Sequence, residues 1–398
     1  MTVSNEMRDC SPSPSLMISL QIFFKFLKKT SVEAKSRVRG RKAKSATIRR
    51  QPSALPEELC RQFSLAELQV ATNNFHDDLI RCKLGFGKVY EGLLHDGTLT
   101  VAVKPYGAEE FRTELQLLSQ LRHQNLVRLF GFCKEKEERM LVYEYLNNGA
   151  LRDHLHKGGD PLPWKQRLEI CIGAARGLHY LHTGAKYTVI HRNVKSSNII
   201  LDENWAAKLA NFGVSKMVPP STSKPKVLTK TNSRVAGTFG YMAPEYMMNG
   251  ELSEKCDVFS FGVVLFEVLC GRLAYEHIII EGNVVSWICN CTKAGGIHDI
   301  IDPYLKGKIA PVCLIQFLEI AFSCIHPKAN ERPTMGEVEV TLELALELQE
   351  RADSVMKAVN PHAHYAYEEV PFHVSLRDYN EYLYETDINE DSFSAADE

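Results

Sequence analysis

Short β-rich runs and longer helical runs occupy different parts of the chain. The β-rich runs come first, at Lys88–Leu94, Leu99–Lys104, Leu126–Cys133 and Met140–Tyr145, with one helical run among them at Glu109–Leu121. Helical spacing dominates afterwards, over Trp164–His182, Asp257–Cys270, Val312–Cys324 and Met335–Gln349. A strand-rich small part followed by a helix-rich large part predicts a two-lobed α+β enzyme fold.

The pattern divides the 398 residues into four segments. They are a basic head (1–60), a small lobe (61–146), a large lobe (147–350) and an acidic, tyrosine-rich tail (351–398). Eleven Lys/Arg and one acid lie between Lys25 and Arg50, whereas ten acids and one Arg lie from Glu368 onward. Such charge-rich segments resist packing, so we expect the head and the tail to be solvated.

The head contains one apolar stretch, Leu16–Leu27, with apolar residues at helical spacing and cations after it. A bilayer-spanning helix needs about twenty apolar residues, and this stretch is too short. Two interpretations stay open. One is an amphipathic helix that lies on an anionic membrane surface, and the other is a disordered basic leader with chance periodicity. The first would place a cytoplasmic protein at the periphery of the plasma membrane.

Charge and cysteine content exclude other classes of protein. The net charge of −2 argues against a general nucleic-acid binder. Eleven cysteines without a regular framework indicate a reduced, intracellular protein. Cys289 and Cys291 lack a second nearby pair, so we do not expect a zinc site.

Candidate chemistry begins with Lys104, at the end of a strand, and Glu114, ten residues later on a helical run. A strand lysine paired with a helix glutamate can hold nucleotide phosphates. Further strings follow in a fixed order. They are Ile190-His-Arg-Asn-Val-Lys-Ser-Ser-Asn198, Lys208-Leu-Ala-Asn-Phe-Gly213, Gly237-Thr-Phe-Gly-Tyr-Met-Ala-Pro-Glu245, Asp257-Val-Phe-Ser-Phe-Gly262 and Glu331-Arg-Pro333.

With these strings in this order, the chain resembles the plant receptor-like (Pelle-type) Ser/Thr protein kinases, in the Pto-like and FERONIA-like branch. The closer similarity lies in Phe63–Leu68 with Ala71–Phe75, in Trp164–His182 and in Phe261–Gly271. The resemblance covers about residues 62–350. It implies the two-lobed protein-kinase fold and ATP as cofactor, with Mg²⁺ or Mn²⁺. Because no ectodomain precedes the domain, it also implies the cytoplasmic branch of this class.

The resemblance assigns an ATP site to both lobes. Cys82 and Leu84 stand where the first two glycines of the phosphate lid belong, so the lid is expected to be impaired. The other residues implied in nucleotide binding are Gly85, Phe86, Gly87, Val89, Ala102, Lys104, Glu144, Leu146 and Ile200.

Two catalytic aspartates of the family are asparagines here. Asn193 holds the position of the base that accepts the substrate hydroxyl proton, and an amide cannot act as a base. Loss of a general base typically costs about 10²–10⁴ in rate. Asn211 holds the position of the main Mg²⁺ carboxylate, which makes metal binding doubtful. Lys195 and Asn198, the later members of the catalytic loop, are retained.

The structural residues of the family are retained. The resemblance implies a buried ion pair between Glu245 and Arg332, and an Asp257 that holds the catalytic loop. His191, Phe212 and Leu118 are expected to stack between the lobes. The connector Pro105–Gly107 is about six residues shorter than is usual, and we expect it to restrict movement of the following helix.

The segment between Gly213 and Gly237 is rich in hydroxyl groups and cations. Candidate phosphorylation sites are Thr229, Thr231, Ser233 and, just beyond the segment, Thr238. The retained Arg192 is the usual partner of a phosphate there. An ordinary polar loop is the alternative interpretation.

Two hypotheses about function follow. In the first, the chain is a pseudokinase that acts by binding other protein kinases or receptors, with possible residual ATP binding. In the second, retained Lys104, Glu114, Lys195 and Asn198 support an active Ser/Thr kinase that transfers the γ-phosphoryl group of ATP to protein hydroxyls. Loss of base, metal ligand and lid glycines together favours the first.

Overall fold

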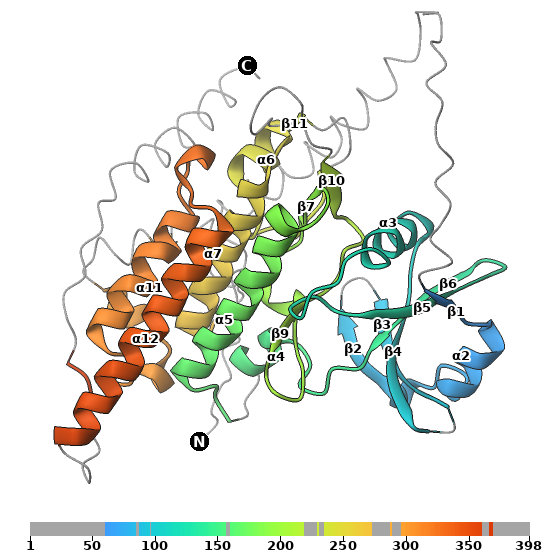
Figure 1. Ribbon diagram of the computed structural model, residues 1–398, viewed down its shortest axis with the longest axis horizontal. Coiled ribbons are helices and arrows are strands. Elements are labelled where there is room, and N and C mark those ends of the chain that lie inside the picture. Colours follow the sequence, from blue (N-terminus) through green and yellow to red (C-terminus); the bar gives the residue numbers. More distant parts are fainter. Residues whose placement is uncertain are drawn as a thin grey trace, which may run out of the picture.

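The computed structural model describes residues 60–84, 87–95, 97–156, 160–218, 229–230, 235–272, 287–288, 296–359 and 366–368. These residues form a small lobe built on a β-sheet and a large helical lobe, which lie side by side in Figure 1. The predicted two-lobed α+β fold is confirmed. The head up to residue 59, with its candidate membrane-surface helix, lies outside the described residues, as do Cys289 and Cys291.

The small lobe is a six-stranded sheet in the order β1-β5-β6-β4-β3-β2. All neighbours are antiparallel except β1 and β5. The strands are β1 (Arg61–Gln62), β2 (Ile80–Leu84), β3 (Gly87–Leu94), β4 (Leu99–Pro105), β5 (Leu129–Glu135) and β6 (Glu138–Glu144). Two helices accompany the sheet, α2 (Leu65–Ala71) and α3 (Ala108–Leu118), with a 3₁₀ turn η1 (Asp77–Leu79) before β2.

Side-chain alternation along the strands gives the sheet two different faces. Val101 and Val103 of β4 pack with Leu68 of α2 in one apolar cluster. Ala102 and Lys104, one residue out of phase, point to the opposite face. On that face Phe111, Leu115 and Leu118 of α3 join the main core, which continues into the large lobe.

The large lobe packs long helices around α7 (Glu254–Cys270), in which nearly every residue is buried. The helix α5 (Trp164–His179) packs on α12 (Met335–Val359), and α12 also packs on α11 (Pro311–Cys324). The remaining helical segments are α4 (Leu151–His156), η2 (Tyr180–Gly184), η3 (Ser196–Asn198), α6 (Pro244–Asn249), α10 (Ile297–Ile300), η4 (Pro303–Leu305) and η5 (Ala329–Glu331). Short strands β7 (Thr188–Ile190), β8 (Ile199–Leu201), β9 (Ala207–Leu209), β10 (Lys216–Val218), β11 (Thr229–Lys230) and β12 (Glu251–Leu252) form three antiparallel pairs.

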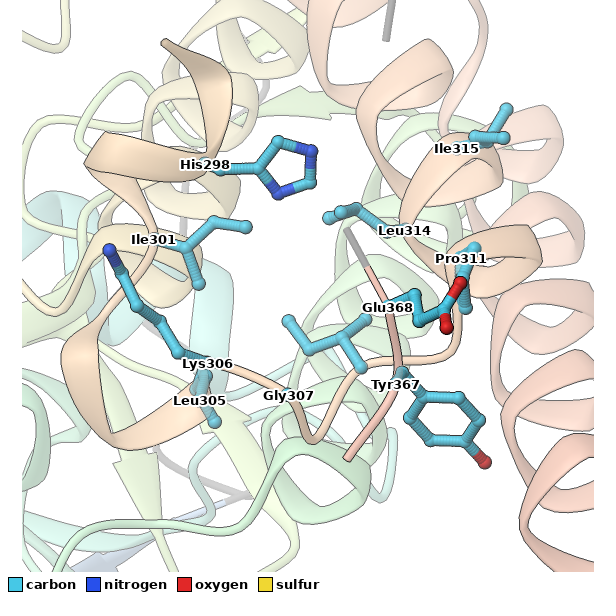
Figure 2. A pocket seen from close by; sticks show the side chains of 11 residues that line it. His298, Ile301, Leu305, Lys306, Gly307, Pro311, Leu314, Ile315, Tyr367 and Glu368 are labelled. Atoms are coloured by element: carbon cyan, nitrogen blue, oxygen red, sulfur yellow. The ribbon is translucent and has the colours of Figure 1, made fainter. Parts of the chain in front are cut away.

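The last helix, predicted to end at Gln349, extends further along the chain. Helix α12 continues to Val359, and residues 366–368 lie against the large lobe. The Tyr367 backbone N–H donates to the Gly307 carbonyl at 2.9 Å, and the Tyr367 hydroxyl donates to Asp353 at 2.8 Å. Figure 2 shows Tyr367 and Glu368 at a cavity beside Leu314. None of the residues expected in the nucleotide site lines this cavity.

Helices long and apolar enough to cross a bilayer do not occur in the part of the chain that the structure describes. Within the same residues, His, Cys, Asp and Glu side chains form no cluster of three that could hold a metal ion. The cysteines whose side chains the structure describes are all buried and form no disulfide: Cys60, Cys133, Cys171, Cys256, Cys270, Cys313 and Cys324.

Candidate nucleotide and catalytic site

The small-lobe part of the site is built by β3, β4 and β6. In the sheet register Ala102 lies opposite Tyr143, and Lys104 opposite Leu141. Val89, Ala102 and, from β8 in the large lobe, Ile200 are each half-buried, and their place in an adenine site stays a prediction. Gly85 and Phe86 lie outside the described residues, as do the side chains of Cys82 and Leu84. Leu84 and Gly87 are backbone partners at the end of the β2–β3 pair.

The segment that joins the lobes begins at Glu144, the last residue of β6. The Glu144 carboxylate accepts a hydrogen bond from the Arg128 backbone N–H at 2.8 Å and lies 3.2 Å from Lys208 Nζ. Half-buried Leu146 packs against the main core two residues later. These contacts link the end of β6 to the residue before β5 and to β9, so the segment expected to bind adenine is held from both lobes.

Asn193 sits in a closed network in the catalytic loop and is 4% exposed. Its backbone N–H donates to Nδ1 of His191 at 3.2 Å, and its backbone carbonyl accepts from Nδ2 of Asn198 at 2.7 Å. Its side-chain Oδ1 accepts from the Thr238 hydroxyl at 2.9 Å. The amide oxygen therefore acts as a hydrogen-bond acceptor, but the group carries no charge and cannot take up a proton at neutral pH.

Asn211 connects the strand lysine to the catalytic loop. Its Oδ1 accepts from Lys104 Nζ at 3.2 Å, and its Nδ2 donates to Oδ1 of Asn198 at 3.3 Å. Asn211 has a φ of 73°, in the left-handed region that asparagine tolerates better than most residues. The two residues expected to ligate metal are thus neutral amides that hydrogen-bond to each other.

Lys104 and Glu114 were expected to form an ion pair, but each has a different hydrogen-bond partner. Glu114 lies on the apolar face of α3 with Phe111 and Leu115 and is 1% exposed. Its Oε1 accepts from the Tyr143 hydroxyl at 2.8 Å, whereas its Oε2 is buried without a hydrogen-bond partner. Lys104 donates to Asn211, and its Nζ lies 4.3 Å from the centre of the Tyr106 ring.

Lys195 is half-buried, two residues after Asn193. Burial holds the pKa of Lys195 below its usual value, and the nearby Arg152 cation lowers it further, while Glu267 opposes the shift. A cation that is already partly desolvated is suited to bind an anion.

Asp257 holds the catalytic loop from the first turn of α7. Its carboxylate accepts from the backbone N–H groups of His191 and Arg192, each at 2.8 Å, and contacts His182 Nε2 at 2.9 Å. Arg192 has a φ of 67°, an unfavourable conformation for a residue with a side chain. The buried carboxylate therefore offsets backbone strain at the centre of the loop.

Two of the buried contacts expected between other elements are present, the Glu245–Arg332 ion pair and the contact between the His191 and Phe212 rings. Arg332 donates to both oxygens of Glu245, at 2.7 and 2.9 Å, and its side chain is fully buried. The ring centres of His191 and Phe212 lie 4.8 Å apart in an edge-to-face arrangement. Leu118 of α3 belongs to the same core cluster.

Among the candidate phosphorylation sites, only Thr238 has a described side chain, the one that contacts Asn193. Thr231 and Ser233 lie outside the described residues, and of Thr229 only the backbone in β11 is described. Arg192, the expected phosphate partner, donates to the Tyr246 hydroxyl and, at 2.8 Å, to the Val214 carbonyl.

Sequence reasoning missed Tyr106 and Tyr143, whose hydroxyls are joined at 2.8 Å next to Glu114. Strand alternation carries the signal that could have found them. Positions 102, 104 and 106 share one face of an extended chain, and Leu141 and Tyr143 share one face of β6.

This fold and this arrangement of lysine, catalytic loop and metal loop define a protein kinase domain. Comparison with known proteins agrees, since residues 81–342 match the family described as protein tyrosine and serine/threonine kinase. The chain belongs to this family.

Its relatives are plant receptor-like kinases. It is 50% identical over 326 residues to the receptor-like protein kinase FERONIA of Arabidopsis thaliana, which covers 80% of this chain and 36% of FERONIA. It is 52% identical to ANXUR1 over 76% of this chain and 36% of ANXUR1, and 48% identical to THESEUS 1 over 75% and 35%, both from the same plant. The chain spans about a third of the length of these relatives.

Proposed function

We propose that this receptor-like kinase homologue is a pseudokinase that acts by binding in plant signalling. The observation that carries the proposal is the hydrogen bond from Asn211 to Asn198, which joins the two metal-ligand positions through neutral amides. Protein kinase domains in general use ATP and a divalent metal. Mg²⁺ favours anionic oxygen ligands, and this donor set offers none, so it does not fit the metal of the family.

Loss of the base supports the same conclusion. Asn193 occupies the base position with its oxygen bonded to Thr238. Without a carboxylate it can orient a hydroxyl group but cannot accept its proton, at a cost of about 10²–10⁴ in rate. The base and the metal ligand contribute to the same transfer step in different ways, the base by accepting a proton and the metal by neutralising phosphate charge, and both contributions are impaired here.

Nucleotide binding without metal is compatible with the site. Two carboxylates fewer make the site less negative, which reduces repulsion of the ATP phosphates. Lys104 and Lys195 supply cations for those phosphates, and Glu144 and Leu146 supply the segment between the lobes. We propose weak ATP binding as the residual property of the domain.

An active Ser/Thr kinase is the second candidate, because Lys104, Glu114, Lys195 and Asn198 are retained. A phosphoryl-transfer assay of the full chain with Mg²⁺ and with Mn²⁺ separates the two. We expect no transfer above that of Lys104→Met, and measurable transfer in the double variant Asn193→Asp, Asn211→Asp. Transfer by the native chain at an ordinary kinase rate, abolished by Lys104→Met, would establish the second candidate instead.

Other protein kinases or receptors are the proposed partners, because the fold retains a kinase surface while the catalytic groups are changed. We also propose that the basic head binds an anionic membrane surface, which would place a cytoplasmic protein at the plasma membrane. Sedimentation of the full chain with phosphatidylserine vesicles at low salt, compared with neutral vesicles, tests the membrane contact. Equal binding to both vesicle types would refute it.

A further inference from the structure

The connector between β4 and α3 is reduced to Tyr106 and Gly107, because the strand ends at Pro105 and the helix begins at Ala108. The Tyr106 backbone N–H donates to the Arg139 carbonyl at 2.9 Å, which extends the pairing of β4 with β6 by one residue. Tyr106 is thus held in extended form, two residues after Lys104. By strand alternation the two side chains lie on the same face of the sheet.

Tyr106 contacts Lys104 directly and is connected to Glu114 through Tyr143. Lys104 and Glu114 are the two residues that were expected to form an ion pair. Its ring lies 4.3 Å from Lys104 Nζ, a distance at which a cation is attracted to an aromatic face. Its hydroxyl lies 2.8 Å from the Tyr143 hydroxyl, which in turn donates to Glu114 Oε1 at 2.8 Å.

The hydroxyl chain has a single direction. The Tyr143 hydroxyl donates its one proton to Glu114, so Tyr106 is the donor in the hydrogen bond between the two tyrosines. Burial raises the pKa of both phenols well above the usual value, and the Glu114 charge raises both further. Both tyrosines therefore stay neutral donors, and the chain runs from Tyr106 through Tyr143 to Glu114.

We propose that Tyr106 is a positioning residue that replaces the lysine–glutamate ion pair and holds α3 against the sheet without a nucleotide. Protein kinases require that ion pair for activity, and its formation depends on the position of this helix. Here the ring of Tyr106 contacts Lys104, and its hydroxyl is connected to Glu114 through the Tyr143 hydroxyl. Helix α3 then keeps the same position with and without ATP, so a partner protein would bind the same surface in both cases. This inference rests on the proposed binding function.

Hydrogen exchange of the α3 amides in the full chain, with and without ATP in EDTA, tests the proposal. In the native chain we expect exchange rates of α3 to change less than about twofold on adding ATP. In Tyr106→Ala we expect roughly tenfold faster exchange without ATP, because a charge-assisted chain of hydrogen bonds is lost. We also expect ATP to slow that exchange, because Lys104 can then reach Glu114.

Tyr106→Phe separates the two contacts, since it keeps the ring over Lys104 and removes only the hydroxyl. It should show an intermediate increase in exchange, and it serves as the test if Tyr106→Ala does not fold. Tyr90→Phe is the matched control, because Tyr90 is a buried tyrosine of the opposite face of the sheet, in the cluster with α2. It should leave α3 exchange unchanged.

The proposal is overturned if Tyr106→Ala and Tyr106→Phe exchange like the native chain, or if ATP protects α3 of the native chain as strongly as that of Tyr106→Ala. The readout is helix protection and not phosphoryl transfer. If the native chain proves to be an active kinase, the proposed function is refuted. The role of Tyr106 is still decided by the exchange rates of the α3 amides.

Discussion

The side-chain nitrogen of Asn211 donates a hydrogen bond to the side-chain oxygen of Asn198 across 3.3 Å. An aspartate at position 211 could not make this bond, because an ionised carboxylate has no proton to donate. The asparagine also accepts from Lys104, so each end of its amide has a partner. The substitution therefore joins lysine, metal loop and catalytic loop in a network that needs no metal.

The first prediction concerns this network. Asn211→Asp restores a hard anionic ligand, so ATP with Mg²⁺ should stabilise the variant more than ATP in EDTA. At a ligand concentration 100 times the dissociation constant, the added free energy of unfolding is about 2.7 kcal/mol. Thermal-shift titrations measure it. Asn204→Asp makes the same chemical change at an exposed position and should show no metal dependence. Equal melting temperatures of Asn211→Asp with and without Mg²⁺ would contradict the prediction.

The second prediction concerns the ion pair between Glu245 and Arg332. Arg332→Met leaves a largely buried carboxylate without its cation and also removes donors to the His326 and Pro327 carbonyls. Breaking such a pair costs about 3–5 kcal/mol. Chemical denaturation should show a loss of this size in the free energy of unfolding.

Arg351→Met is the control for this measurement. Arg351 forms an exposed i,i+4 pair with Glu347 on α12, and such pairs contribute about 0.3–0.5 kcal/mol. The two variants lose the same charge from different environments. A similar small loss in both would show that the Glu245–Arg332 pair adds little to stability.

The third prediction is a pH dependence from His191, which is fully buried and neutral. Its Nδ1 accepts from the Asn193 N–H and its Nε2 donates to the Ala210 carbonyl at 3.1 Å, so a second ring proton would face a donor. Burial lowers the pKa of His191 in the folded chain, against the opposing Asp257 charge. Burial also lowers the pKa of His123.

Because the unfolded chain takes up these protons at a higher pH than the folded chain, stability is complete above about pH 6.5 and falls below it. The slope is at most about 1.4 kcal/mol per pH unit for each proton. Denaturation of the native chain and of His191→Phe at pH 7.5 and 5.5 measures it. The variant should lose less stability between the two pH values, and an unchanged difference would exclude His191 as a source.

The fourth prediction concerns residues 366–368 (Figure 2). Tyr367→Phe removes the donor to Asp353, and a hydrogen bond to a charged group contributes about 1.5–3 kcal/mol. Hydrogen exchange at the Tyr367 amide should rise by a factor of about ten or more, while the α7 amides stay protected. Tyr187→Phe, in the loop before β7, is the control. Unchanged exchange at residue 367 would show that the backbone bond to Gly307 suffices.

The strands and long helices follow from local pattern, and most were predicted within a few residues. Alternating apolar residues identify β4, and helical spacing identifies α5, α7 and α11, because burial of one face is repeated along each element. The end of α12 was misplaced. Its last turns, from Arg351 to Val359, are largely exposed, so no buried face marks them as helical in the sequence.

Spacing in the sequence indicated which motifs belong together, but not how their side chains pair. Lys104 and Glu114 were expected to contact each other, and each has another hydrogen-bond partner in the fold. We attribute this to Tyr106, which strand alternation places on the same face of the sheet as the lysine. Neither the connector length nor the tyrosine alone reveals that contact, because it depends on where β6 places Tyr143.

By itself, the sequence determined the kinase class, the two lobes and the replacement of two aspartates by asparagine, because these depend on residue identity and local periodicity. Only the tertiary structure decided what the asparagines do. Asn211 meets Asn198 and Lys104 from positions 13 and 107 residues away. Asn193 meets Thr238 across 45 residues. Hydrogen bonds of this kind form where separate elements pack, and packing sets their partners.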